Sequence, residues 1–115
     1  MSEKPYYTPE EQMICTAARI IEDGSTCFIG YGMPQFVAIL AQRTGAPNMH
    51  QVYEFGAIDP QVVTPLRAMT FGDSRNNYRS VCWTTMNPAF AHAAVGLIDY
   101  GFLGVAQIDP HGNIN

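Results

Sequence analysis

The sequence predicts an α/β fold with an open, mostly parallel sheet flanked by helices. Segments of helical periodicity alternate with short β-branched and aromatic runs, and the links between them are short. A strand, a returning helix and a second strand favour parallel pairing. The 115 residues suffice for one hydrophobic core, so residues 8–115 are expected to form a single domain after an N-terminal arm of residues 1–7.

The first helix is expected to begin after Thr8. Thr8 can cap the first turn, Pro9 suits the first helical position, and Glu11 stands where a capping box places its carboxylate. An apolar stripe with i, i+3, i+4, i+7 spacing faces the core and comprises Ile14, Ala17, Ala18 and Ile21. Gly24 is expected to end the helix.

A short buried strand is expected over residues 26–29, which are rich in β-branched and aromatic side chains. This strand leads into the turn Gly30-Tyr31-Gly32-Met33-Pro34. Pro34 is expected to start a helix that runs through Gln42 and stops at Gly45. The predicted buried face of that helix comprises Phe36, Ile39 and Leu40.

The next strand is expected over residues 51–54, closed by Gly56. Prolines and a glycine interrupt residues 57–77, which are expected to form loops with short elements, and residues 78–85 are β-prone.

The end of the chain is expected to contain a helix, a strand and a turn. The pair Asn87-Pro88 provides a cap and a proline for a helix over residues 89–99, which Gly101 ends. A strand over residues 102–108 and a tight turn over residues 109–112 are expected to follow.

Composition narrows the functional classes. Hydrophobic residues make up 47% and charged residues 14% of the chain, which favours apolar surface hidden by a partner in an obligate assembly. The formal charge of −4 comes with no basic stripe, so nucleic acid is not an expected partner. No apolar run reaches the length of a membrane span and the first residues lack a secretory signal, so a cytoplasmic protein is expected.

Cysteine, histidine and serine patterns indicate no further chemistry. Cys15, Cys27 and Cys82 form no CxxC pair and are expected to be three buried thiols. The histidines lack metal-ligand spacing, so no metal site is expected, and no serine lies in a G-x-S-x-G setting.

Glu54 is the strongest catalytic candidate. It lies at the predicted carboxyl end of a strand, where α/β sheets bind their ligands, between Tyr53 and Phe55. A solvated loop glutamate is the alternative, and position alone does not decide between the two.

Two other segments can contribute to a site. Residues 30–34 combine backbone N–H groups with a helix N-terminus, which favours an anion or a developing oxyanion. They lack the third glycine of GxGxxG and the lysine of a P-loop, so a plain strand-to-helix turn is the alternative. Residues 104–115 are rich in amide side chains that can lock a loop, and Asn113 and Asn115 can also orient a substrate or a partner loop.

Three stretches, in this order, resemble the β subunit of family I coenzyme A transferases, the glutaconate and 3-oxoacid types especially. They are residues 30–34 (GYGMP), 53–58 (YEFGAI) and 106–115 (AQIDPHGNIN). The resemblance covers nearly the whole chain as the N-terminal part of such a subunit. It implies a CoA-transferase-like α/β fold that is incomplete without a companion chain.

The resemblance implies that Glu54 is the nucleophile. In that family a glutamate attacks an acyl-CoA, forms a mixed anhydride and then holds CoA as a glutamyl thioester, before CoA passes to a second carboxylate. A carboxylate nucleophile divides one difficult exchange into easier steps. Coenzyme A is then a substrate, and no tightly bound cofactor is implied. The implied substrate-binding residues are Gly30, Tyr31, Gly32, Met33, Phe55, Gly56, Gln107 and Asn113.

The sequence departs from the family pattern in two ways. Phe55 stands where the family commonly has serine, which favours an aromatic, cyclic or larger apolar acyl group. Related subunits continue well past Asn115, so the remainder is hypothesised to be a separate companion chain, made by cleavage after Asn115 or encoded apart. The expected partners are this companion, an α-type subunit, and a small carboxylic acid or acyl-CoA.

Three functions stay open on the sequence alone. CoA transfer between carboxylic acids is favoured. A CoA-transferase-like hydrolase, ring-opening or acyl-transfer enzyme with a repurposed site is the second, and a non-catalytic subunit that completes a partner's fold is the third. Retention of Glu54 argues against the third.

Overall fold

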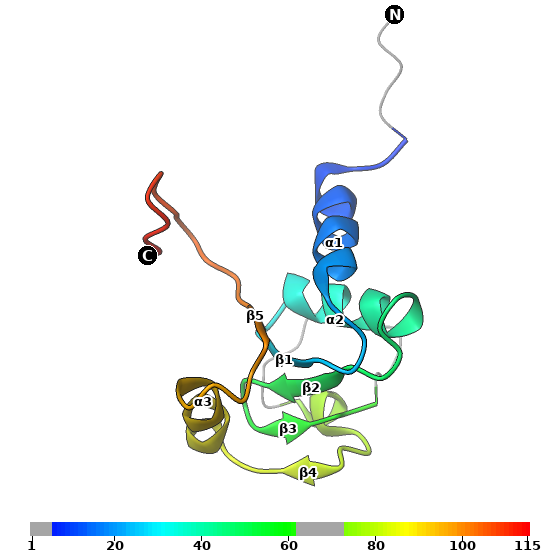
Figure 1. Cartoon of the computed structure of the whole chain (residues 1–115), viewed down its shortest axis with the longest axis vertical. Helices are drawn as coiled ribbons and strands as arrows, with labels where there is room; N and C mark the ends of the chain where they lie inside the picture. Colours follow the sequence, from blue (N-terminus) through cyan, green and yellow to red (C-terminus); the bar gives the residue numbers. More distant parts are fainter. Residues whose placement is uncertain (1–5, 62–72) are drawn as a thin grey trace, which may run out of the picture.

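The computed structural model describes residues 6–61 and 73–115. The elements along the chain are α1 (Pro9–Ile20), β1 (Thr26–Ile29), α2 (Met33–Arg43), β2 (His50–Tyr53), β3 (Ala57–Ile58), the 3₁₀ helix η1 (Ser74–Asn77), β4 (Cys82–Trp83), α3 (Met86–Ala94) and β5 (Tyr100–Phe102). The five strands form one sheet in the order β4-β3-β2-β1-β5 (Figure 1). Strands β2, β1 and β5 run parallel, β3 runs antiparallel to β2, and β4 runs antiparallel to β3. The predicted open, mostly parallel sheet flanked by helices is confirmed.

Helix α1 begins with the predicted capping box. The backbone N–H of Thr8 donates to Glu11 Oε2 at 2.8 Å, and the N–H of Glu11 donates to Thr8 Oγ1 at 3.1 Å. The predicted stripe faces the core, with Ala18 and Ile21 buried. The helix ends at Ile20, and Gly24 occupies the following turn with a φ of +80°.

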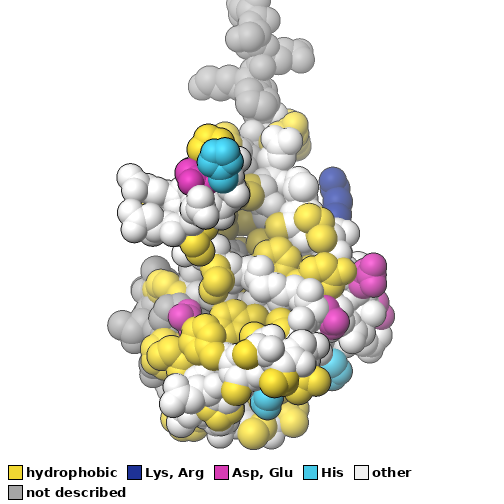
Figure 2. Space-filling model, turned by 60° about the vertical axis from the view of Figure 1, so that its left-hand side comes forward, with side chains coloured by type: hydrophobic (Ala, Val, Ile, Leu, Met, Phe, Trp, Pro, Cys, Tyr) yellow, Lys and Arg dark blue, Asp and Glu magenta, His cyan; other side chains and the backbone are white. Residues whose placement is uncertain are grey.

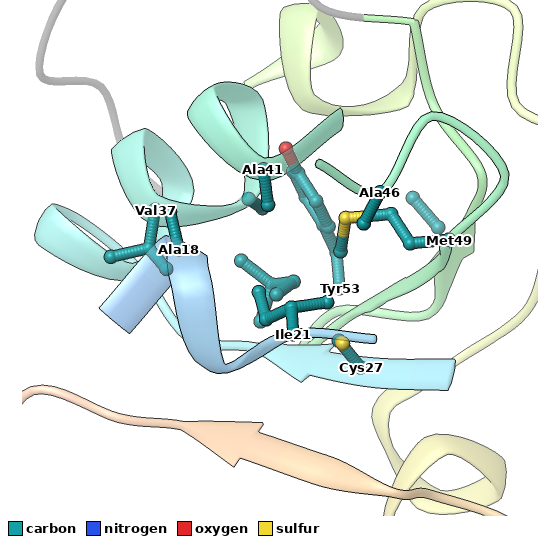
Figure 3. Packing of buried hydrophobic residues seen from close by; sticks show 11 residues of the cluster. Ala18, Ile21, Cys27, Val37, Ala41, Ala46, Met49 and Tyr53 are labelled. Atoms are coloured by element: carbon teal, nitrogen blue, oxygen red, sulfur yellow. The ribbon is translucent and has the colours of Figure 1, made fainter. Parts of the chain in front are cut away.

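Helix α2 presents only part of the predicted face to the core: Leu40 packs against the main cluster and Ile39 is partly buried, but Phe36 is not. Phe36 is 47% exposed, so the prediction that it is buried is wrong. The buried apolar side chains are instead Val37, Ala38 and Ala41, together with Pro34. Small side chains at these positions let α2 approach α1 and the sheet closely, which a phenyl ring would prevent (Figure 3).

Helices cover both faces of the sheet, with α1 and α2 on one face and α3 on the other (Figure 1). Side chains alternate along β1: Cys27 and Ile29 join the cluster beneath α1 and α2, whereas Phe28 joins a smaller cluster with Ala89 of α3. The ring centroids of Phe28 and Phe90 lie 5.3 Å apart. This alternation fixes which face each residue near a strand end occupies.

Helix α3 spans residues 86–94, so the predicted span of 89–99 is wrong at both ends. Thr85 is the N-cap residue, and Pro88 fits the third helical position because that N–H has no intrahelical acceptor. At the other end Gly96 has a φ of +80°, and the N–H of Leu97 donates to the carbonyl of His92 at 3.0 Å. This is a Schellman motif, in which Gly96 and not Gly101 stops the helix.

The strands of the second half are shorter than expected. The β-prone residues 78–85 form a strand only at Cys82–Trp83, and the strand predicted over 102–108 is Tyr100–Phe102. Residues 57–61 and 73–77 contain β3 and η1 as the short elements expected there, while residues 62–72 of that prediction lie outside the described residues. The turn at residues 109–112 is confirmed by a hydrogen bond of 3.1 Å from the N–H of Gly112 to the carbonyl of Asp109.

The three cysteines are not alike. Cys27 is buried, but Cys15 and Cys82 are exposed, so the prediction of three buried thiols is wrong. Cys15 falls on the outer side of α1, and Cys82 lies on the edge strand β4.

Among the described helices, none combines the length and the apolar character needed to cross a membrane.

Candidate active site

Three segments leave the sheet side by side at the carboxyl edge of its parallel strands. Glu54 follows β2, Gly30 follows β1, and Leu103 follows β5. The N–H of Glu54 donates to the carbonyl of Ile29 at 3.3 Å, and the N–H of Gly30 donates to that of Phe102 at 2.8 Å. The strand ladder thus continues one residue past the strand ends and holds Glu54 beside the glycine turn.

The carboxylate of Glu54 is half-buried and available for chemistry. Among the residues that the structure describes, none donates a hydrogen bond to it, and no cation lies within ion-pair distance of it. A hydrogen bond of 2.8 Å from the N–H of Gly56 to the carbonyl of Tyr53 closes the tight turn that carries it. A carboxylate in this setting keeps its lone pairs free for attack on an electrophile.

Gly56 fixes that turn against the chain that joins β4 to α3. Its φ is +93°, and an added Cβ would lie 2.6 Å from the carbonyl oxygen of Thr84 and 2.7 Å from that of Thr85. The N–H of Thr84 also donates to the carbonyl of Gly56 at 2.9 Å. Only glycine allows this approach of two backbones, so the turn bearing Glu54 is rigidly placed.

The Gly30–Pro34 turn lies next to Glu54, but two of its N–H groups are already used inside the chain. The N–H of Gly30 is bound by β5, and the N–H of Gly32 donates to Gln35 Oε1 at 3.2 Å. Tyr31 is half-buried and Met33 is the first residue of α2, with part of its side chain exposed. Any contribution of the turn to anion binding therefore comes from the helix N-terminus as a whole and not from these two amides.

Gln35 is a site-organising residue that the sequence interpretation missed. Its side chain is 4% exposed and, besides accepting from Gly32, donates through Nε2 to Asn76 Oδ1 at 3.0 Å. It also hydrogen-bonds Tyr53, whose pKa burial raises to about 12, and this hydrogen bond opposes the rise. A signal existed: a glutamine three residues after a helix cap is the capping-box position.

A hollow of about 300 Å³ adjoins the Glu54 turn. Its apolar lining contains Phe55, Trp83 and Met86, and its polar lining includes residues of η1 with Asp73 before it. The remaining lining residues are Tyr53, Ala57, Thr84 and Thr85. Tyr53 and Phe55 flank Glu54 in sequence and both line the hollow, whereas Glu54 itself is not one of its lining residues, so the hollow adjoins the turn that carries the nucleophile candidate.

The amide-rich C-terminal segment forms a hairpin of its own. The N–H of Asn115 donates to the carbonyl of Gln107 at 3.0 Å, and Asn113 Nδ2 donates to Asp109 Oδ2 at 2.7 Å. The hydrogen bonds from Asn113 hold the pKa of Asp109 below its usual range. Figure 1 shows this hairpin extending away from the sheet, so within this chain Gln107 and Asn113 are grouped with each other and not with Glu54.

No metal centre is apparent in residues 6–61 and 73–115, where no three His, Cys, Asp or Glu side chains converge. His50 instead pairs with Asp59, with Nδ1 2.8 Å from Oδ2. That pair lies at the amino end of β2, on the opposite edge of the sheet from Glu54.

The sequence profile of the coenzyme A transferase family matches residues 10–115. The chain belongs to the coenzyme A transferase family. It is 37% identical over 111 residues to one subunit of the 3-oxoadipate CoA-transferase of Pseudomonas knackmussii, covering 95% of this chain and 42% of that protein. It is 34% identical over 122 residues to one subunit of the glutaconate CoA-transferase of Acidaminococcus fermentans, covering 100% and 44%. The chain thus spans less than half the length of these relatives.

Solved structures of a decarboxylase and of a CoA-transferase share the fold. The decarboxylase AibA/AibB is 28% identical with a TM-score of 0.82, over 94% of this chain and 45% of that one. Glutaconate CoA-transferase from Acidaminococcus fermentans is 29% identical with a TM-score of 0.78, over 98% and 45%. The resemblance drawn from the three sequence stretches is confirmed at the level of the family, which is a family of enzymes.

Proposed function

We propose that Glu54 is the nucleophile of a CoA transfer between an acyl-CoA and a carboxylic acid. The observation that carries the proposal is the position of its half-buried carboxylate at the carboxyl edge of β2, beside the glycine turn after β1. Ligands of α/β sheets bind at this edge. The relatives named as 3-oxoadipate and glutaconate CoA-transferases support the same reaction class.

In the proposed reaction, the Glu54 carboxylate attacks the thioester carbonyl of the acyl-CoA and expels CoA as its thiolate. The resulting mixed anhydride is attacked by that thiolate at the glutamyl carbonyl, which releases the first carboxylate and leaves CoA on Glu54 as a thioester. A second carboxylate then repeats the two steps in reverse and leaves as the new acyl-CoA. No proton or electron is consumed overall, and exclusion of water from the assembled site would limit hydrolysis of the intermediates.

The partners proposed for this chain are an α-type subunit and a polypeptide that supplies the second half of the fold. Both relatives are named as single subunits of a larger enzyme, which supports the first partner. Exposed apolar side chains after α3 support both, namely Val95, Leu97, Leu103, Val105, Ile108 and Ile114. Figure 2 shows hydrophobic side chains gathered on the side of the molecule that carries this segment.

Trapping the thioester tests the proposal. The assembled protein is incubated with acyl-CoA and its Glu54 peptide is analysed by mass spectrometry, with and without borohydride. The expected result is a CoA-sized mass increase on this peptide, replaced by the reduced alcohol after borohydride. Glu54→Gln should abolish the adduct and lower kcat by several orders of magnitude.

Glu22→Gln is the matched control, because Glu22 is an exposed carboxylate near the amino end of β1, at the opposite edge of the sheet. This variant should form the adduct at the rate of the unmodified protein. Turnover of acyl-CoA that survives in Glu54→Gln would overturn the assignment of the nucleophile.

A further inference from the structure

We propose that the hollow beside Glu54 holds the acyl group of the CoA thioester and selects an apolar, ring-sized monocarboxylic acid over a dicarboxylic acid. The inference rests on the proposed function for the identity of the reacting carboxylate. The hollow itself, with its volume of about 300 Å³, falls at the small end of the range for small-molecule sites.

The apolar wall is suited to a ring. Phe55, Trp83 and Met86 line it, and the Trp83 side chain is 69% exposed in the chain as it stands. Aromatic rings offer flat apolar faces, and thioether sulfur adapts to irregular apolar shapes. A cyclic or branched acyl group would cover these faces, whereas a short linear one would leave most of them in water.

The charge of the hollow argues against a second carboxylate. Among its described lining residues there is no Lys, Arg or His, and the charged side chain present is Asp73. A distal carboxylate would lose water without gaining a cation and would face a like charge. The acids after which the two relatives are named, 3-oxoadipate and glutaconate, are dicarboxylates, so this chain is inferred to differ from those relatives in the acyl group.

The polar wall can accept a neutral substituent. Asn76 and Asn77 of η1 and the hydroxyl-bearing Tyr53 line the hollow, and Asn77 Oδ1 already accepts a hydrogen bond of 2.7 Å from Ser80. Amide and hydroxyl groups of this kind bind hydroxyl or keto groups without favouring charge. The acyl group is therefore an apolar ring that tolerates a neutral oxygen substituent.

Both walls are held in place without ligand. Gly56 fixes Phe55 to the Thr84–Thr85 backbone, and Gln35 ties Asn76 to the glycine turn. A preformed site spends little binding energy on ordering its walls.

Trp83 supplies a direct readout, because it is the one tryptophan of the chain. The assembly carrying Glu54→Gln, which cannot form a thioester, is titrated with cyclohexanecarboxyl-CoA and with glutaryl-CoA while tryptophan emission is recorded. The same assembly with Trp83→Phe added provides the background. The expected result is a blue shift from Trp83 with cyclohexanecarboxyl-CoA and none with glutaryl-CoA.

Kinetics on the protein with Glu54 intact gives the second measurement. We expect kcat/KM for cyclohexanecarboxyl-CoA to exceed that for glutaryl-CoA at least tenfold, and Phe55→Ser to reduce that ratio. Phe36→Ser, which removes a similarly exposed ring on α2 outside the hollow, should leave the ratio unchanged.

The outcomes separate the two proposals. A Trp83 shift without any adduct on Glu54 would support the hollow as the acyl site while refuting the nucleophile. An adduct on Glu54 with no Trp83 response, or with preference for glutaryl-CoA, would refute the acyl site alone.

Discussion

Gln35 bonds to three neighbours from the first turn of α2, so its replacement tests how firmly the candidate site is built. Gln35→Leu leaves the part-buried N–H of Gly32 and the buried Oδ1 of Asn76 without this partner. We expect the free energy of unfolding to fall by about 1–3 kcal/mol, measured by urea denaturation. The exposed Gln12 provides the control, and a Gln12→Leu change of equal size would refute the role of the buried amide.

Tyr53 should make stability depend on pH in the alkaline range. Burial raises the pKa of its phenol from 10.0 to about 12, so the folded state holds the proton more tightly than the unfolded state. This stabilisation is complete below pH 10 and is lost as the pH rises from about 10 to about 12, a change of roughly 2–3 kcal/mol. Tyr53→Phe should remove this part of the pH dependence of the unfolding free energy. An unchanged alkaline slope in the variant would contradict the assignment.

At the scale of elements, the contact of the Glu54 turn with the β4–α3 link predicts a large effect of one methyl group. Gly56→Ala places Cβ within 2.7 Å of two carbonyl oxygens at a positive φ, so we expect a loss of roughly 3 kcal/mol or more in unfolding free energy. Gly24→Ala has a similar φ but open space around Cβ, and should cost about 1–2 kcal/mol. Thermal unfolding of both variants separates steric conflict from backbone strain, and equal losses would exclude the conflict.

Elements encoded by neighbouring residues were predictable from the sequence, and those set by distant contacts were not. The Thr8 cap of α1 and the strand at residues 26–29 depend on local chemistry, and both have the predicted positions. Helix α2 is apolar on more than one side, so its periodicity could not show that Ala38 rather than Phe36 faces the core. The end of α3 offered two glycines, and only the Schellman hydrogen bonds select Gly96.

The same division applies to the candidate site. The place of Glu54 at a strand end followed from the strand signal and Gly56, although β2 ends one residue earlier than predicted. The hollow joins residues 53–57 to residues 73–77 and 83–86, which no local pattern links. Gln35 was missed because its partners, Tyr53 and Asn76, meet it only in the folded chain.

At the scale of the whole molecule, the apolar surface after α3 predicts association. Val95, Leu97 and Ile108 are 71%, 60% and 66% exposed, more apolar area than an isolated protein keeps in water without cost. We expect the chain alone to self-associate in sedimentation velocity experiments and to become a defined assembly with an α-type subunit and the second half of the fold. Leu97→Lys with Ile108→Lys should reduce self-association and weaken that assembly. A stable monomer at micromolar concentration would contradict this expectation.

The pairing of β1 with β5 has a consequence for how the protein is made. β1 and β2 can pair as soon as Tyr53 has left the ribosome, but β1 receives its other neighbour only when Phe102 arrives. At roughly 5–20 residues per second, the roughly 50 residues in between take about 3–10 s to synthesise. During those seconds β1 is an edge strand that leads into Gly30 beside Glu54. Its unpaired backbone groups can bind another strand. The immediate surroundings of Glu54, the proposed nucleophile, therefore stay open to chaperones on a translating ribosome until β5 has been made.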